Sequence, residues 1–406
     1  LFSRLKGKLL PMASAAVTSS HFSCQTADGA ARTLNGPAVT SARWLRGDEL
    51  PLHVLRTEHL AGKVFWFLRV AEVANAMAVQ SGLEFPARAV LGAQRPVLHL
   101  LGGHDGRSLS SHCWRMEPAT GDWQEVAPLP TARSMASAAA LGGRLYVVGG
   151  FDGEFLQNME VFDPAWNEWS PGPPMSQRRG GLGLVALCGQ LFACGGREGD
   201  IYHTSAECFR LPSQVLEPSA GRWHPLPALS RSRCYPAAVR YAEGVWLCGG
   251  LTRSSDGTGG YLASAEFLSL DASSWCRGPP LLQPRASAAA AELRIGLIVC
   301  GGCTKEGPID TAEILASQAD SHTFQALPKL HGFRNLPAAA LAMAPCAAQG
   351  EFFRKRLLIF GGFNGKKHLK TVEAFNEESC SWELVGELPE PVLAAAATAV
   401  CMPLSS

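Results

Sequence analysis

Five arginines recur at one fixed distance from an aromatic residue, and their spacing marks them as candidates for ligand binding. Each stands ten residues after its aromatic, at Arg133, Arg179, Arg233, Arg285 and Arg334, following Trp123, Trp169, Trp223, Trp275 and Phe324. A guanidinium group binds carboxylates and phosphates through paired hydrogen bonds. Together with His104, Arg178 and Arg197, these arginines predict a partly basic mouth that binds an acidic or phosphorylated peptide.

A structural role for the same arginines is the alternative interpretation. A feature present in every repeat can tie loops to the neighbouring unit, or pair with acids that also recur, at Glu160, Glu207, Glu313 and Glu373. This interpretation is favoured for any single repeated arginine, because ion pairs also recur without a function. Arg197 follows its glycine pair directly and is not repeated, so it is the strongest candidate for ligand contact.

Other residue types could support metal or redox chemistry. Cys194, Cys248 and Cys300 precede glycine pairs in different repeats, too far apart to share one ion, so we expect small buried hydrophobic side chains. Cys234-Tyr235 and Tyr202-His203 are the nearest approach to a copper-radical site. Three aspartates could in principle act on a sugar, Asp105, Asp152 and Asp256. Their positions are better explained as turn residues. We predict no catalytic residue, metal or cofactor.

The elements that position these residues are six repeats of an apolar run that ends in two glycines, as in "LYVVGGFDG". The pairs begin at Gly102, Gly149, Gly195, Gly249, Gly301 and Gly361. A period near fifty residues is typical of propellers and solenoids. The pattern between markers predicts four short strands in each unit, the first alanine-rich, as in "SMASAAAL".

These features predict an all-β fold, a six-bladed β-propeller of four-stranded blades with a small helical N-terminal segment. Small side chains suit the innermost strands, where all the units crowd around one axis. The segment Ala394–Met402 resembles an inner strand but has no glycine pair after it. We therefore expect it to complete the first blade, which closes the ring and removes an open sheet edge.

The glycine pairs, the Glu-x-aromatic of "MEVF" and "VEAF", the trailing tryptophan and the "PLPTAR" connector together resemble the kelch repeat. The resemblance covers roughly residues 97–402. It implies a protein-interaction module, and in kelch adaptor proteins arginines of such loops bind acidic degron peptides. Some kelch-like propellers are instead enzymes.

The N-terminal region divides into two predicted parts. Residues 1–40 are rich in Ala, Ser and Thr and are expected to be disordered. Residues 41–90 contain a helical pattern, and "LPLHVL" with "VFWFLRVAEVANAMAVQS" resembles a degenerate F-box, which implies docking on a cullin ubiquitin ligase. Helices that cap the propeller are the alternative. The propeller is expected over 91–406.

Composition narrows the partners and the compartment. The chain has 36 Lys+Arg and 35 Asp+Glu, so no strongly basic surface favours nucleic acid. No apolar run has the length of a membrane-spanning helix, so we expect no membrane partner. The 13 cysteines are scattered without a CxxC pair, which favours a reducing compartment, the cytoplasm or the nucleus.

These observations together favour one function over two alternatives. We predict a protein-interaction module that serves as the substrate-recognition adaptor of a ubiquitin ligase. The alternatives are a cytoskeletal or signalling scaffold and a propeller enzyme that acts on a sugar or by copper-radical oxidation.

Overall fold

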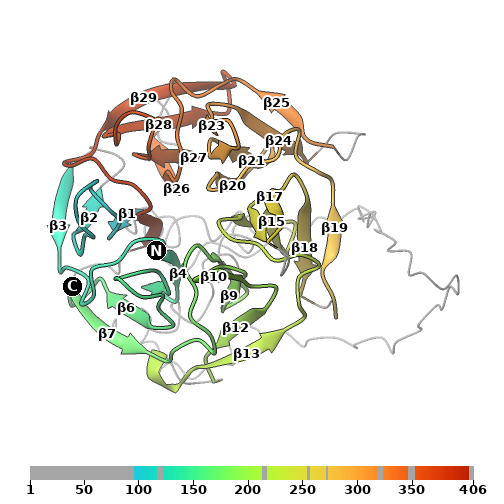
Figure 1. The fold of residues 1–406 in the computed structure, drawn as a ribbon. Helices are drawn as coiled ribbons and strands as arrows, with labels where there is room; N and C mark the ends of the chain where they lie inside the picture. The colour runs from blue at the N-terminus through green and yellow to red at the C-terminus, as the bar shows by residue number, and fades with distance from the viewer. Residues whose placement is uncertain are drawn as a thin grey trace, which may run out of the picture. The chain divides into compact units, whose positions relative to one another are not determined.

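The computed structural model describes residues 96–401, apart from gaps at 117–121, 213–216, 254–256, 271–272, 318–322 and 346–352. These residues form six four-stranded antiparallel sheets around one axis, the blades of a propeller (Figure 1). The fold predicted from the repeats is confirmed. The predicted N-terminal parts 1–40 and 41–90 lie outside the described residues. No helix of the described residues is long and apolar enough to cross a membrane.

Blades one to three, each taken from the axis outward, have the following strands. Blade one has β30 (Ala396–Cys401), β1 (Pro96–Leu101), β2 (Cys113–Met116) and β3 (Trp123–Val126). Blade two has β4 (Ser137–Leu141), β5 (Arg144–Val148), β6 (Met159–Asp163) and β7 (Glu168–Gly172). Blade three has β8 (Gly183–Leu187), β9 (Gln190–Cys194), β12 (Ala206–Arg210) and β13 (Arg222–Leu226), with the 3-10 turn η1 (Pro218–Ala220) before β13.

Blades four to six repeat this order, and three of the six blades carry an extra hairpin. Blade four has β14 (Ala237–Tyr241), β15 (Gly244–Cys248), β18 (Ala265–Ser269) and β19 (Cys276–Gly278). Blade five has β20 (Ala289–Leu293), β21 (Gly296–Cys300), β24 (Ala312–Ala316) and β25 (Gln325–Leu327). Blade six has β26 (Ala338–Pro345), β27 (Phe353–Phe360), β28 (Thr371–Asn376) and β29 (Ser381–Glu387). The hairpins are β10 (Arg197–Glu198) with β11 (Ile201–Tyr202), β16 (Leu251–Arg253) with β17 (Gly259–Tyr261), and β22 (Cys303–Thr304) with β23 (Gly307–Pro308).

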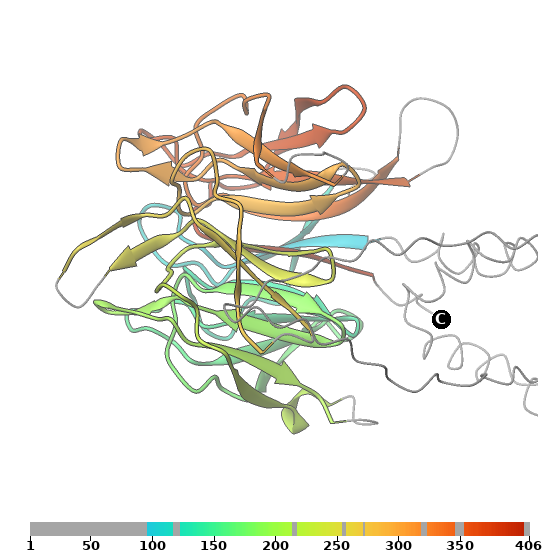
Figure 2. The ribbon, with the colours of Figure 1, turned by 90° about the vertical axis from the view of Figure 1, so that its right-hand side faces the viewer.

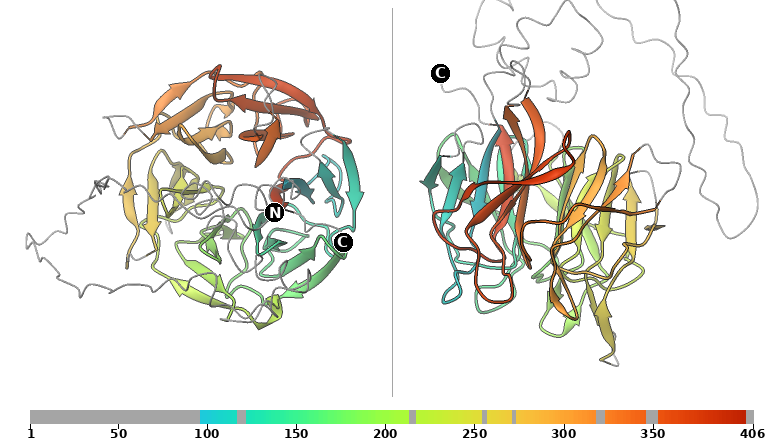
Figure 3. Two further views of the ribbon diagram at one scale, coloured as in Figure 1. Left: turned by 180° about the vertical axis from the view of Figure 1, so that it is seen from behind. Right: turned by 90° about the horizontal axis from the view of Figure 1, so that it is seen from above.

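The innermost strands are rich in alanine, as predicted. Each contacts the inner strand of the next blade, so that β4, β8, β14, β20, β26 and β30 line the axis in turn (Figure 3). Alanine favours helices in isolation. Its small side chain fits here because six strands converge at the axis, and packing overrides the intrinsic preference.

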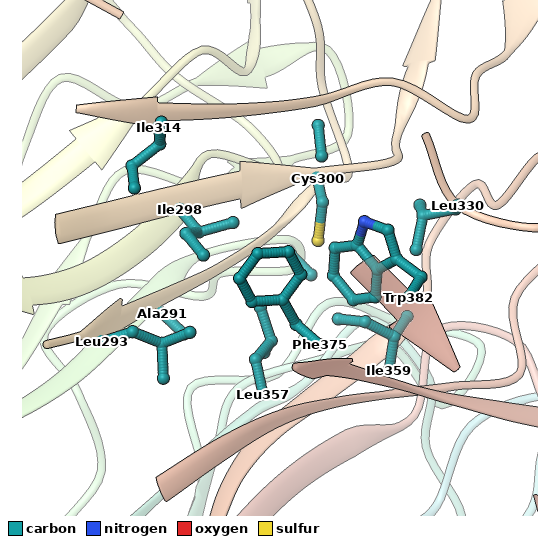
Figure 4. Close-up of a cluster of buried hydrophobic side chains, with 12 residues drawn as sticks. Ala291, Leu293, Ile298, Cys300, Ile314, Leu330, Leu357, Ile359, Phe375 and Trp382 are labelled. Atoms are coloured by element: carbon teal, nitrogen blue, oxygen red, sulfur yellow. The ribbon is translucent and has the colours of Figure 1, made fainter. Parts of the chain in front are cut away.

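The apolar core is divided among the seams between neighbouring blades. One cluster fills each of the six seams. Figure 4 shows the seam of blades five and six, where Ile298 and Cys300 from one blade meet Ile359, Phe375 and Trp382 from the other. Each blade therefore depends on both neighbours for the burial of its two faces, as expected for repeat architectures.

The glycine pairs are explained by close contact between backbones. Gly149 and Gly150 both have positive φ, 64° and 107°. A Cβ on Gly149 would clash with the carbonyl oxygen of Arg179, which begins the next blade, and Gly150 donates its N–H to that same oxygen at 2.9 Å. Only glycine gives both the conformation and the space, so the pair fixes each blade to its successor.

The trailing tryptophans also join successive blades. The indole nitrogen of Trp169 in blade two donates to the carbonyl of Ala127, just after blade one, at 2.8 Å. The same contact recurs at later seams, from Trp223 to Pro173, from Trp275 to Pro227 and from Trp382 to Pro328. Phe324 is buried at the corresponding place but lacks an N–H donor. The aromatic residue that marks each repeat in the sequence therefore lies at the seam between two blades.

The two ends of the described chain meet in blade one. Strand β30 pairs with β1 along six residues, from Leu101 opposite Ala396 to Pro96 opposite Cys401. The predicted closure by the C-terminal segment is confirmed. Strand β30 thereby pairs the edge of β1 that would otherwise be open at the point where the ring begins and ends.

Candidate functional site

The face that carries the six glycine-pair loops is the candidate binding face, and we call it the mouth face. Blades one, two and six have short loops there, at 104–109, 151–155 and 363–368. Blades three, four and five carry the three extra hairpins instead. Figure 2 shows the yellow β16–β17 hairpin extending well beyond its blade. The mouth face is therefore uneven, with loop variation held by a rigid scaffold, as is typical of binding surfaces.

The five repeated arginines lie inside the blades, not on the mouth face. Their exposed fractions are 0–1%. Arg233 donates through Nε and Nη2 to the Glu266 carboxylate and through Nη1 to the carbonyls of Gly249 and Ser264. This differs from the predicted basic mouth, because a buried guanidinium with all its partners inside the protein presents no donor to a ligand. The structural alternative accounts for these contacts.

The same arrangement recurs in blades two to six. Each guanidinium bonds the carbonyl of the first glycine of its own blade and a buried glutamate on the third strand; the pairs are Arg133–Glu160, Arg179–Glu207, Arg233–Glu266, Arg285–Glu313 and Arg334–Glu373. The recurring acids predicted from the sequence include four of these glutamates but not Glu266. The sequence signal is weaker there, because Leu268 stands in place of the aromatic of the Glu-x-aromatic pattern and the β16–β17 hairpin displaces Glu266 along the chain.

Burial sets the electrostatics of these pairs. Desolvation lowers the pKa of the Arg133, Arg179 and Arg285 guanidinium groups, and the facing glutamates oppose that shift. An unpaired charge in this environment would be costly, so each arginine and glutamate depends on the other.

Blade one replaces the ion pair with apolar side chains. Val392 stands where the other blades have arginine, and Trp114 stands opposite Leu100, at the glutamate position. Val392 is buried and Trp114 packs against the same apolar cluster. The indole nitrogen of Trp114 donates to Glu390 at 3.3 Å. The fold therefore accepts either a complete ion pair or none at this position.

Of the three remaining predicted residues, Arg197 is the best placed for a ligand. It is half-buried at the base of the β10–β11 hairpin, and its guanidinium carbon lies 5.2 Å from the centre of the Phe155 ring. Its Nη1 donates to the Gly199 carbonyl, while its buried Nε has no hydrogen-bond partner among the described residues. A half-buried guanidinium that is held over an aromatic ring and has no acidic partner among the described residues is suited to pair with an anion from a ligand.

Arg178 and His104 are engaged in contacts with the loops. Arg178 is exposed and pairs with Glu154 at 2.8 Å and with Glu198 at 3.9 Å. His104 accepts the Gly106 N–H at Nδ1, and its ring lies 6.5 Å from that of His368. Both lie on the mouth face. The structure therefore places Arg178, Arg197 and His104 on the surface predicted for them, and it buries the five repeated arginines inside the blades.

The axial channel opens at the centre of the blades. A cavity of about 180 Å³ is lined by the first residues of the inner strands, mostly alanine. The Tyr235 hydroxyl lies 2.9 Å from the Met135 sulfur, and a Cβ on Gly181 would strike the Tyr235 ring. Glycine at position 181 therefore leaves room for Tyr235, whose side chain reaches from blade four past Gly181 of blade three to Met135 of blade two.

The residues considered for metal or enzyme chemistry have structural contacts. Burial raises the pKa of the Cys194, Cys248 and Cys300 thiols to about 12, which keeps them protonated. Asp105 accepts the N–H groups of Arg107 and Ser108 in a turn. Within the described residues no group of His, Cys, Asp or Glu side chains is arranged to hold a metal ion.

Two further residues considered for enzyme chemistry also make structural hydrogen bonds. Asp152 accepts the Glu154 N–H, again as a turn residue, and His203 donates to the Arg178 carbonyl. Asp256 lies outside the described residues.

The fold and the mouth face define a class, a six-bladed propeller that presents loops for interaction. The Kelch motif family matches residues 132–176 and 346–389. Kelch-like protein 33 of Homo sapiens is 46% identical over 56 residues, which are 13% of this chain and 10% of the relative. The F-box/kelch-repeat protein At1g22040 of Arabidopsis thaliana is 34% identical over 78 residues, 18% of this chain and 16% of the relative. The described residues therefore form a β-propeller in which residues 132–176 and 346–389 match the Kelch motif.

Similarity to a solved structure supports the fold, and the fold alone. The structure of YjhT superposes with a TM-score of 0.56 and 15% identity, covering 72% of this chain and 98% of that one. The sequence matches, by contrast, span 16% or less of the length of the two relatives. The kelch matches and the propeller support a protein-interaction module.

Proposed function

We propose that this propeller is the substrate-recognition part of a ubiquitin-ligase adaptor and binds an acidic or phosphorylated peptide on the mouth face. The supporting observation is Arg197, whose half-buried guanidinium lies over the Phe155 ring on the mouth face. Within the described residues no carboxylate forms an ion pair with it, unlike Arg178 and Arg253 on the same face. A carboxylate or phosphate from a peptide would supply that partner.

The neighbourhood of Arg197 fits a peptide ligand. Three of the chain's five tyrosines, Tyr202, Tyr235 and Tyr261, belong to the mouth-facing segments of blades three and four. Ile201 at the tip of the β10–β11 hairpin is 65% exposed. Aromatic and apolar surface around one cation favours a peptide that carries an acidic group beside an apolar residue, because such anchors supply most of the binding energy at interfaces.

The binding test uses Arg197→Ala and the matched control Arg222→Ala, an exposed arginine on β13. An array of acidic and phosphoserine peptides is screened with the full chain, and the strongest binder is titrated by calorimetry. We expect Arg197→Ala to weaken binding about tenfold or more and to reduce its salt dependence, since a desolvated charge contact is lost. Equal affinity in the variant and the wild type would refute the role of Arg197.

The adaptor role is tested separately by affinity capture with mass spectrometry. The full chain is compared with a chain that starts at Ala87. A cullin adaptor recovered only with the longer chain would support docking through residues 41–90, which lie outside the described structure. Recovery of cytoskeletal or signalling proteins without any ligase component would instead favour a scaffold. We propose the cytoplasm or nucleus as the place of action.

A further inference from the structure

A second cavity lies on the side of blade four, away from the channel. Its volume is about 450 Å³. Its walls come from the connector between blades three and four, from β17 and β18, and from β19, and the side chains that matter here are Ser230, Arg231, Glu266, Trp275 and Arg277. This volume suits a small-molecule or side-chain ligand.

The cavity contains two arginines without an acidic partner. Arg231 and Arg277 are both exposed, and neither takes part in an ion pair among the described residues. The one carboxylate in the wall is Glu266, which is already neutralised: Oε1 accepts from Arg233, and Oε2 accepts the Ser230 N–H at 2.8 Å. Two positive charges therefore remain uncompensated around one cavity.

These arginines are not part of the repeat. Arg277 lies opposite Glu266 across β18 and β19. The residues at the same register in the other blades are Glu125, Pro171, Pro225, Ala326 and Leu384. Arg231 stands two residues before the seam position, where the others have Thr131, Gln177, Gln283, Gly332 and Glu390. Five blades fold without either arginine, so the fold does not require the pair.

The cavity wall beside the arginines is fixed. The Trp275 indole donates to the Pro227 carbonyl at 2.9 Å, which holds its ring against the connector that carries Arg231. Ser230 is exposed at the rim, and its side-chain hydroxyl has no hydrogen-bond partner among the described residues. A rigid indole, a free hydroxyl and two guanidinium groups form a site that a dianion can satisfy.

We propose that this lateral cavity binds a phosphomonoester dianion through Arg231 and Arg277, carried by a phosphoserine-containing peptide. Two guanidinium forks match the charge and the three oxygens of a phosphoryl group better than they match a single carboxylate. The cavity exceeds the volume of a phosphate alone, which leaves room for the flanking peptide against Trp275. The site is separate from Arg197 and does not depend on the proposed mouth-face ligand.

The test measures phosphate-ester binding to the full chain by calorimetry and phosphorus NMR. The probes are a degenerate phosphoserine peptide mixture, the same mixture with serine, O-phosphoserine, and inorganic phosphate. The variants are Arg231→Gln, Arg277→Gln and their combination, each made in an Arg197→Ala background that removes the proposed mouth-face contact, with Arg222→Gln in the same background as the control. We expect each single variant to weaken phosphopeptide binding about tenfold relative to Arg197→Ala alone, and the combination to abolish it, with the Arg222→Gln control unchanged. Thermal unfolding of each variant checks that the fold persists.

The outcomes distinguish a phosphopeptide from a small phosphate ester as the ligand, and the lateral cavity from the mouth face as the binding site. Phosphopeptide binding that exceeds O-phosphoserine binding supports a protein ligand, while equal binding of both assigns the cavity to a small phosphate ester. No binding of any phosphorylated probe, or equal binding of the serine mixture, would overturn the proposal. Loss of all phosphopeptide binding in Arg197→Ala alone would also overturn it, and would place the phosphoryl group on the mouth face.

Discussion

At the scale of single residues, His99 shows how one repeat position can take a titratable side chain. It lies three residues before its glycine pair, where the other blades have large apolar residues, namely Tyr146, Phe192, Trp246, Ile298 and Leu358. It is 1% exposed and packs edge-on against Phe162. Nδ1 donates to the Val97 carbonyl at 3.2 Å, while Nε2 is buried without a partner among the described residues.

The burial of His99 predicts loss of stability in acid. Desolvation lowers its pKa from 6.5 to about 4. The unfolded chain therefore binds a proton at a higher pH than the folded chain, and stability falls as pH drops from about 6.5 towards 4. The loss from this one group is about 3 kcal/mol at most.

We expect His99→Phe to remove this part of the pH dependence. Urea unfolding of wild type and variant at pH 7.5 and 4.5 should show a difference that grows by about 2 to 3 kcal/mol in favour of the variant at the lower pH. Exposed His224→Phe is the control. Parallel stability curves for His99→Phe and wild type would show that His99 does not titrate in this range.

At the scale of elements, the arginine–glutamate pairs fasten strands to connectors. Arg285 precedes inner strand β20 and reaches the end of β21 at the Gly301 carbonyl and the Glu313 carboxylate on β24. Glu313 also accepts the Leu282 N–H from the connector. Three strands and the incoming chain thus meet at one buried pair, which explains why the spacing from aromatic to arginine is constant.

Removing one partner should destabilise the blade more than removing both. Arg285→Met leaves the Glu313 charge buried, which we expect to cost about 3 to 5 kcal/mol in the free energy of unfolding. Arg285→Met with Glu313→Leu should recover part of that loss, since blade one folds with Val392 and Trp114. Chemical denaturation measures both, with exposed Arg294→Met as the control. A double variant less stable than the single would contradict this explanation.

At the scale of the whole propeller, stability depends on closure. Six seams hold six separate apolar clusters, and β30 belongs to blade one while β29, just before it, belongs to blade six. The contacts of β30 reach β1, β4 and β26, so one segment joins blades one, two and six. Blades one and six are buried on both faces only when the ring is closed.

Deletion of residues 396–406 should therefore abolish cooperative folding. The expected result is loss of a single unfolding transition and aggregation through the exposed edge of β1. Calorimetry and size-exclusion chromatography measure these properties, and deletion of residues 402–406 is the control. A monomeric, cooperatively folded protein without β30 would show that closure is not needed.

The sequence alone determined the blade count, the four-strand pattern, the alanine-rich inner strands and the closing segment. Each of the six blades packs in the same way, so the same residue pattern recurs in every repeat and can be recognised by its period. The sequence also located the mouth face and Arg197. Tertiary structure alone decided that Arg133 and its four equivalents are buried, since depth from solvent depends on neighbouring blades. It decided too that Arg231 and Arg277 share one cavity: they are 46 residues apart in the chain, and only the pairing of β18 with β19 beside the connector brings them to the same walls.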